Sequence, residues 1–221
     1  MLTPSNKERN AALRVATPFE SAPPDSTSAS SVSEADTLGV TPESDATVGE
    51  VSGLFTMLLM GILEERLAAE ALRGLLRRAG ETRPLEELKE IGSWTSFDQF
   101  KRLLEEAARL FGLEFLANGR CLFSASIENF DMSETIQAFG SPGAVLRGGD
   151  TNPMLPMRRY EKTEVSSNEW TIREWFIDGF APYPEFCAFF AGQYSGIPMY
   201  FGFPAAEVIE EECQCRGDRC V

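Results

Sequence analysis

The sequence predicts an α+β fold in which helices pack on a small antiparallel sheet. Apolar residues recur at helical spacing over residues 51–76, as expected of an amphipathic helix. Residues 157–165 and 169–177 are rich in β-branched and aromatic side chains, and a short polar stretch separates them, which is typical of a hairpin. Four of the five cysteines lie in the stretch from Cys187 to Cys220, so the cysteine cluster belongs to the sheet half of the chain.

Composition predicts one folded domain preceded by a tail. The chain has 221 residues, of which 43% are apolar, and this suffices for one buried core. Residues 1–49 are rich in Ser, Thr, Pro, Asp and Glu, and their few apolar residues follow no helical or strand period. We therefore expect a disordered Ser/Thr/Pro-rich tail over residues 1–49 and the folded domain over residues 50–221.

Charge and residue usage exclude several classes of function. A formal net charge of −14 would repel a phosphate backbone, so we expect no direct binding of nucleic acid. The chain has no histidine, which excludes Ser-His-Asp and Cys-His hydrolysis and His-ligated haem. No glycine-rich phosphate-binding motif and no secretory signal pattern occurs. The prediction is a cytoplasmic protein whose cysteines are thiols or metal ligands, because the cytosol is reducing.

The first helix of the domain is predicted to be long. Thr47-Val-Gly-Glu50 has the pattern of a capping box, in which a hydroxyl and a carboxylate satisfy free amides of the first turn. The apolar spacing then continues from Val51 to Leu76. Its most apolar part is too short to cross a bilayer and is followed directly by charged residues. We therefore expect a core or dimer-forming helix in preference to a membrane contact.

Shorter helices follow, with clear end signals. Residues 84–90 suit a short helix. Ser96-Phe-Asp-Gln99 is a second capping box that opens a helix over residues 97–111, which Gly112 ends.

The helical signal weakens between residues 113 and 139, although residues 133–139 look helical. Ser141 and Pro142 are residue types preferred at the N-cap and first turn of a further helix. Cys121 stands alone in the sequence and is interpreted as a small buried apolar residue.

The sheet half leads into the helix that carries the first cysteine of the cluster. Trp170, Ile172 and Phe176 share one face of the second predicted strand by alternation and should cover the helices. Pro184 helps to introduce an apolar helix that contains Cys187.

The glycines of that helix predict a close contact. Gly192 and Gly196 leave a smooth groove where another element or a ligand can approach. Pro198 is expected to end the helix, and a strand is expected over residues 207–211.

The cysteine cluster has the residue types of a structural zinc site. Cys187, Glu210, Cys213 and Cys220 supply three thiolates and one carboxylate, and structural zinc takes four such ligands in tetrahedral order. A site of this kind would tie the helix to the sheet and contribute folding free energy. Free thiols or a single disulfide are the alternatives that the spacing leaves open.

These residues resemble the carboxy-terminal half of the 4-vinyl reductase domain. The likeness rests on Cys187-x-x-x-Ala-Gly-x-x-Ser-Gly196 followed by Glu210-x-x-Cys213-x-x-x-Gly-Asp-x-Cys220. It is strongest with the effector-binding domain of aromatic-responsive activators of the XylR type, and it extends to sensor domains upstream of cyclase-type or kinase modules in bacteria.

The resemblance implies a sensor domain over residues 50–221 that is not an enzyme. The positions matching Cys187, Glu210, Cys213 and Cys220 would hold structural zinc, with no open position for a reacting water. A neighbouring hydrophobic cavity would take a small apolar or aromatic effector. The candidate effector-binding residues are aromatic, and their alternative role is plain core: Trp170, Phe176, Phe189, Phe190 and Tyr194.

Effector binding would bias a partner. We expect a homodimer through the helix that starts at Val51, or a downstream output module such as a nucleotide cyclase, a kinase or a transcription activator. The same fold class resembles subunits of vesicle-tethering complexes, so an assembly module is the competing function, and a tetrapyrrole vinyl reductase is a third. Cys213 and Cys220 are separated by six residues, one fewer than the family usually has, which makes Cys215 an alternative ligand to Cys220.

Overall fold

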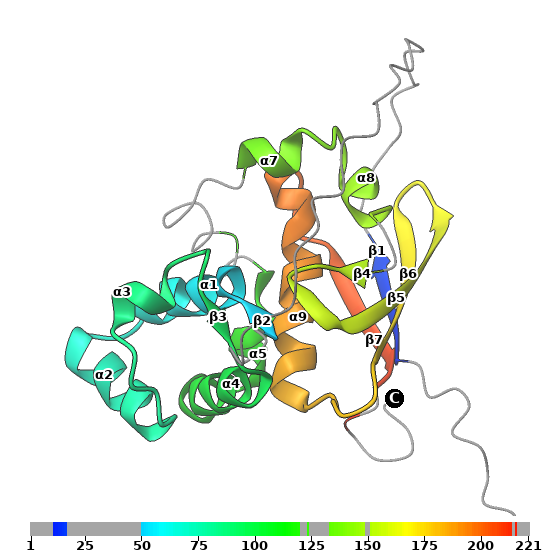
Figure 1. The fold of residues 1–221 in the computed structure, drawn as a ribbon. Coiled ribbons are helices and arrows are strands. Elements are labelled where there is room, and N and C mark those ends of the chain that lie inside the picture. The colour runs from blue at the N-terminus through cyan, green and yellow to red at the C-terminus, as the bar shows by residue number, and fades with distance from the viewer. Residues whose placement is uncertain are drawn as a thin grey trace, which may run out of the picture.

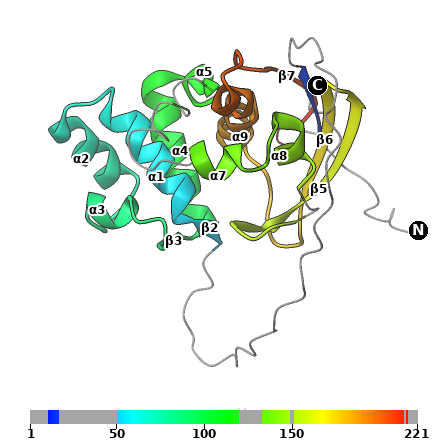
Figure 2. The same ribbon diagram turned by 90° about the horizontal axis from the view of Figure 1, so that it is seen from above.

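The computed structural model describes residues 11–16, 50–119, 123, 133–148, 151–213 and 215. These residues form an α+β fold, as the sequence predicts. A helical half and an antiparallel sheet lie on opposite sides of helix α9 (Pro184–Gly196), which packs against both (Figure 1). Figure 2, seen from above, shows the same order of helices, α9 and strands. Helix α9 therefore joins the two halves.

The helical half is built around one helix that is buried on every side. Its elements are α1 (Gly53–Glu64), α2 (Ala69–Arg78), α3 (Leu85–Leu88), α4 (Phe97–Phe111) and α5 (Leu113–Leu116). All residues of α1 from Gly53 to Leu63 are buried, as in the centre of a core. The predicted single helix over residues 51–76 is wrong. Glu64, Glu65 and Arg66 are charged and exposed, so the chain must leave the core there and turn before α2.

Helix α1 leaves no exposed face for a partner chain, because its own domain surrounds it. Within the stretch that was expected to form the homodimer, the exposed residues lie in the turn after α1 and on the outer side of α2, for example Glu70, Arg73 and Arg77. The homodimer itself stays a prediction.

A two-stranded ribbon sets where α1 and α4 begin. Its strands are β2 (Val51–Ser52) and β3 (Trp94–Thr95), paired antiparallel. The Ser52 side chain accepts a hydrogen bond from the Leu54 amide at 3.3 Å and caps α1. The Glu50 carboxylate accepts from the Phe97 amide at 2.6 Å and so supports α4. The predicted capping box is therefore wrong in the helix it assigns to Glu50, and Thr47 lies outside the described residues.

The predicted ends of α4 are confirmed, but only the Ser96 half of its predicted capping box is formed, because the Gln99 side chain hydrogen-bonds with Ala79 and Arg102. The Ser96 hydroxyl accepts from the Gln99 amide at 3.2 Å, and Gly112 follows α4 with a φ of 82°, a conformation that favours glycine. The Ser141 hydroxyl likewise caps α8 (Pro142–Leu146) through the Ala144 amide at 3.2 Å.

The described residues form a sheet of five antiparallel strands in the order β4-β5-β6-β1-β7. They are β1 (Ala11–Ala16), β4 (Thr151–Asn152), β5 (Leu155–Ser166), β6 (Glu169–Phe176) and β7 (Glu207–Glu212). The predicted hairpin is confirmed in β5 and β6, where Tyr160 lies opposite Glu174. Strand β1 pairs with both β6 and β7. The expectation of a disordered tail over residues 1–49 is therefore wrong at residues 11–16, which form a strand between β6 and β7.

The carboxy-terminal end of α9 is covered by short helices. Helix α9 ends at Gly196, just before Pro198 as expected, and the chain continues into the 3₁₀ helix η1 (Ile197–Phe201). Helices α7 (Ser133–Gln137) and α8 contact η1. The predicted close approach at the glycines of α9 is confirmed, because a Cβ at Gly119 would lie 2.8 Å from the Gly196 nitrogen and 2.9 Å from the Gly192 oxygen.

The buried apolar residues of the described part of the chain form two clusters. The larger one joins α1, α4 and the start of α9, and the smaller one lies between α8 and the sheet around Leu146, Trp170 and Ile172. In the described part of the chain, no helix is long and apolar enough to cross a membrane.

Candidate metal centre and adjoining pocket

Three cysteines meet where the start of α9 approaches the end of β7. Cys187 lies in the first turns of α9, and Cys213 and Cys215 follow directly after β7. The Cys187 Sγ is 3.6 Å from the Cys213 Sγ and 3.7 Å from the Cys215 Sγ, and the Cys213 and Cys215 sulfurs are 2.7 Å apart. Within the described residues, this is the one group of three or more metal-ligating side chains whose ligand atoms lie together.

Two of the three sulfur–sulfur distances fit a thiolate-bound metal. Zinc–sulfur bonds of about 2.3 Å in tetrahedral order place sulfurs about 3.8 Å apart, close to both distances from Cys187. The Cys213 and Cys215 sulfurs, 2.7 Å apart, are closer than this tetrahedral distance. Their separation is still well beyond the roughly 2.05 Å of a disulfide, and all three cysteines are free thiols. Moving these two sulfurs about 1 Å farther apart would make all three distances suit a tetrahedral metal site.

The three thiols influence one another's ionisation. Hydrogen bonding with Cys187 and Cys215 lowers the pKa of Cys213, and the hydrogen bond with Cys213, together with burial, raises the pKa of Cys187. A thiolate at Cys213 is thus stabilised by a neighbour that keeps its proton. A metal ion would replace that proton, because thiolates are the ligand form of cysteine.

The structure brings together only part of the predicted ligand set. Cys187 and Cys213 meet as expected, and Cys215 joins them as the alternative to Cys220, which lies outside the described residues, as does Cys121. Glu210 is not one of the three clustered ligands. It hydrogen-bonds with Cys213 and, with Cys187, lines a small cavity of about 20 Å³.

Three of the five predicted effector-binding residues lie in the main core. Phe176 packs on Phe97 with ring centroids 5.6 Å apart, and Phe189 and Phe190 contact helices α4 and α1 in the same way. None of the three lines the larger pocket described next. Their alternative role as core residues is what the structure shows.

The other two predicted residues, Trp170 and Tyr194, line a pocket of about 410 Å³. We call it the effector pocket, because these two residues were predicted to bind an effector. Further walls come from Pro142 and Leu146 of α8 and from η1, elements that sequence reasoning did not connect with the site. Its size is within the range of about 300–1,000 Å³ that is usual for small-molecule sites, and its walls are largely apolar with a few polar groups at the edge.

An arginine lies at the edge of the effector pocket. The Arg147 guanidinium pairs with the Glu164 carboxylate at 2.8 Å, and its carbon Cζ lies 5.6 Å from the centre of the Trp170 ring, a cation–π geometry. Trp170 itself is buried. The pocket therefore combines aromatic walls with one ion pair that spans α8 and β5.

A buried ion pair lies between the effector pocket and the cysteines. Arg158 is 1% exposed and pairs with Glu174, and the Tyr194 hydroxyl donates to the same carboxylate. Burial opposes the charge on Arg158, but the Glu174 carboxylate outweighs it and raises the arginine pKa. Burial and the same carboxylate also raise the pKa of Tyr194. Glu174 and Tyr194 share the 20 Å³ cavity with Cys187, so polar groups run from the pocket to the cysteine cluster.

Comparison with known proteins adds no support to the resemblance to the 4-vinyl reductase domain, which rests on the cysteine motif alone. No family model matches the sequence, and no curated protein and no solved structure matches it.

Proposed function

We propose that the domain is a ligand-responsive sensor, held by a structural zinc ion and controlled by a small apolar or aromatic effector. One observation carries the proposal. Helix α9 has Cys187 in its first turns and Tyr194 near its other end, so the cysteine cluster and the effector pocket share one rigid element. A shift of this helix would therefore change the geometry of both sites.

Zinc, when bound, supplies a closed four-coordinate centre and adds its binding free energy to folding. Cys187, Cys213 and Cys215 would hold it as thiolates and tie the start of α9 to the end of β7. Glu210 remains our proposed fourth ligand because it lies beside Cys187 and Cys213, and Cys220 is its alternative. Four protein ligands leave no position for a reacting water, which supports a regulatory role and not an enzymatic one.

The effector pocket favours a flat apolar ligand. Trp170 and Tyr194 offer aromatic walls, and Leu146 and Pro142 close the side formed by α8. Aromatic rings prefer offset or edge-to-face contacts with such walls. A single ion pair, Arg147 with Glu164, provides polar contact at the edge without placing an unpaired charge inside.

The proposed signal is a shift between arrangements of α8 and α9. An effector that binds one arrangement better than another moves the population toward it, and by linkage the favoured arrangement binds the effector more tightly. The readout would be a downstream output module, such as a nucleotide cyclase, a kinase or a transcription activator, or a homodimer. Location in the cytoplasm is part of this proposal.

Two observations favour a sensor over an assembly module of the vesicle-tethering type. Helix α1 is enclosed by its own chain and offers no apolar face to a partner, and an apolar pocket lies beside α9. An assembly module would need an exposed apolar face, which α1 lacks, and would have no use for the pocket.

The proposal is tested by thermal unfolding of the zinc-loaded chain with phenol, toluene and indole as probes. A ligand that binds only the folded state raises the melting temperature. We expect at least one probe to do so in the wild type and in Trp94→Leu, a matched variant whose tryptophan is 45% exposed and outside the pocket. The same probe should have no effect on Trp170→Leu.

A second variant keeps the test clear if Trp170→Leu unfolds. Gly143 lines the pocket, and a Cβ there would be in ordinary contact with Trp170 at 3.7 Å, so Gly143→Leu would fill the pocket without a backbone clash. Probes that stabilise Gly143→Leu as much as the wild type would contradict the assignment of the pocket. So would the absence of any stabilising probe in the wild type.

A further inference from the structure

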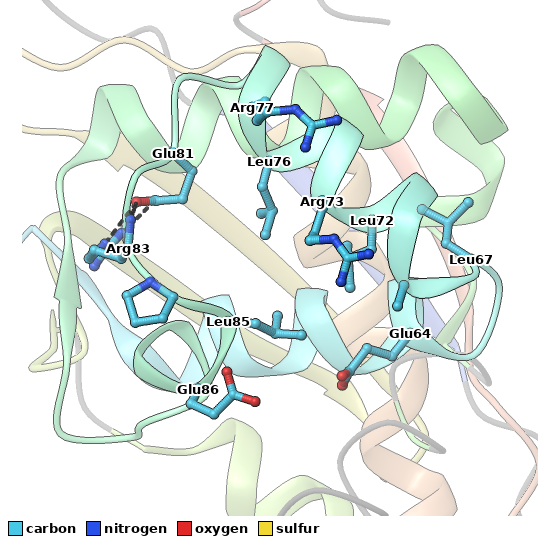
Figure 3. Close-up of a pocket in the computed structure, with 12 residues that line it drawn as sticks. Glu64, Leu67, Leu72, Arg73, Leu76, Arg77, Glu81, Arg83, Leu85 and Glu86 are labelled. Carbon is cyan, nitrogen blue, oxygen red and sulfur yellow. Dashed lines mark hydrogen bonds and ion pairs between the residues drawn. The ribbon is translucent and has the colours of Figure 1, made fainter.

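A second cleft, of about 650 Å³, lies between the end of α1, helix α2 and helix α3 (Figure 3). We call it the α2 cleft. None of its lining residues belongs to the cysteine cluster or to the effector pocket. Its volume is also within the usual range for ligand sites, about 300–1,000 Å³.

The floor of the α2 cleft is aliphatic. Leu67, Leu72, Leu76 and Leu85 line it, and Figure 3 shows Leu76 and Leu85 between Arg77 of α2 and Glu86 on the facing edge. No aromatic side chain is among the lining residues in the described part of the chain. Such a floor offers apolar contact to an alkyl chain and no ring on which a flat ligand could stack.

The rim of the cleft on α2 carries an excess positive charge. Arg73 and Arg77 are one helical turn apart and share a single carboxylate, that of Glu70, with nitrogen–oxygen distances of 2.8 Å for Arg73 and 4.0 Å for Arg77. Among the described residues, the Arg77 guanidinium makes no hydrogen bond and has no nearer carboxylate. Two cations facing one anion leave one positive charge to be balanced.

The acidic residues that line the cleft are either paired with another cation or lie opposite α2. Glu81 pairs with Arg83 at 2.8 Å, and Glu64 pairs with Lys89 at 2.8 Å, so neither carboxylate is available to Arg77. Glu86 lies on the facing edge, across the leucines (Figure 3). An anionic group is therefore attracted to the α2 rim and repelled from the opposite edge, which gives a bound ligand one orientation.

We propose that the α2 cleft binds an alkyl carboxylate, such as a medium-chain fatty acid. The carboxylate would contact Arg77 and Arg73, because the guanidinium fork matches carboxylate geometry. The alkyl chain would lie over Leu72, Leu76 and Leu85. Arg73 already pairs with the Glu70 carboxylate at 2.8 Å, so Arg77 supplies most of the unbalanced positive charge for the ligand.

Octanoate tests the proposal, with 1-octanol and octyltrimethylammonium as probes of equal chain length. Binding is measured by calorimetry on the zinc-loaded full chain, and the site is located by NMR of labelled leucine methyl groups. We expect octanoate to bind more tightly than the other two and to shift the methyl signals of Leu72, Leu76 and Leu85. Affinity should fall as salt is added, since the arginines are exposed.

Three variants test whether the positive charge at Arg77 contributes to octanoate binding. Arg77→Gln should weaken octanoate binding roughly five- to tenfold, as expected for one exposed charge-assisted contact. Arg173→Gln removes the same charge from the outer face of β6 and should leave the affinity within about twofold. Glu86→Gln should not weaken binding, because it removes the repelling charge.

Certain results would overturn the proposal. Equal affinities for octanoate and 1-octanol would remove the role of the carboxylate. An unchanged affinity in Arg77→Gln, or methyl shifts confined to Leu146 at the effector pocket, would place the ligand elsewhere. Because the α2 cleft and the effector pocket share no residue, these results leave the proposed sensor function untouched.

Discussion

Replacing Glu174 by Gln tests whether a buried ion pair holds the sheet to α9. Arg158 on β5 is 1% exposed and pairs with Glu174 on β6, and Tyr194 of α9 donates to the same carboxylate. Gln has nearly the same shape as Glu, so the change removes the charge and keeps one acceptor. Arg158 would remain protonated, since a guanidinium does not lose its proton in proteins, and its charge would stay buried without a counterion.

The expected cost can be estimated from the surroundings of Arg158. Breaking a buried pair by changing one partner costs about 3–5 kcal/mol. We expect about 3 kcal/mol, at the lower end of that range, for two reasons. The Glu174 side chain is 16% exposed. Arg158 Cζ also lies 4.2 Å from the Phe190 ring centre and 4.9 Å from that of Phe186, and these aromatic faces favour a cation.

Urea unfolding at a fixed zinc concentration, followed by tryptophan fluorescence, measures this cost. Glu161→Gln is the matched control, because Glu161 pairs with Arg173 across the same two strands at 3.4 Å with both side chains about half exposed. An exposed pair is worth about 0–1 kcal/mol. Arg158→Met in the Glu174→Gln background should recover part of the lost stability. Equal costs for the two Glu→Gln changes would refute the reasoning.

Two further predictions concern the helical half. Gly53→Ala should destabilise the domain by about 3 kcal/mol in urea unfolding, because a Cβ at Gly53 would lie 2.3 Å from the Glu90 carbonyl oxygen; Gly92→Ala, with open space around its Cβ, is the control, and similar costs would contradict the prediction. Burial opposes ionisation of Glu81, but hydrogen bonds with Arg83 outweigh it and lower the glutamate pKa. The stability that this carboxylate adds is present at pH 7 and lost as pH falls through the lowered pKa, so Glu81→Gln should be less stable than wild type at pH 7, and the difference should shrink as the pH falls below the ordinary glutamate pKa and through the lowered one. A pH-independent difference would refute that assignment.

Local signals predicted several element boundaries correctly. Ser96 and Gly112 mark the two ends of α4, and Ser141 marks the start of α8, because capping depends on a few adjacent residues. The hairpin of β5 and β6 was predictable for the same reason: alternation and a polar loop are local properties.

Features that depend on tertiary packing were not predictable. The apolar spacing from Val51 to Leu76 continues through the break between α1 and α2, since the period alone does not tell a buried helix from a half-exposed one. Strand β1 is six residues long, contains three alanines and lies in a segment otherwise rich in polar residues and proline, so only its pairing with β6 and β7 identifies it.

The sequence predicted the chemistry of the candidate site better than it predicted which residues form the site. Cysteine content indicated a thiolate cluster, but whether Cys215 or Cys220 completes it depends on how the chain turns after β7. Phe189 and Tyr194 belong to one helix and have similar apolar character. Their opposite roles, core and pocket wall, follow from which neighbours each end of α9 meets.

The zinc content of the purified full chain, measured for the wild type, Cys215→Ser and Cys121→Ser, tests the central claim most directly. The account predicts one zinc per chain in the wild type and in Cys121→Ser. Cys215→Ser should lose most of its zinc to a chelator that leaves the wild type loaded, since one of the thiolate ligands is gone. A wild-type chain without stoichiometric zinc, or a Cys215→Ser variant that holds zinc as tightly as the wild type, would contradict it.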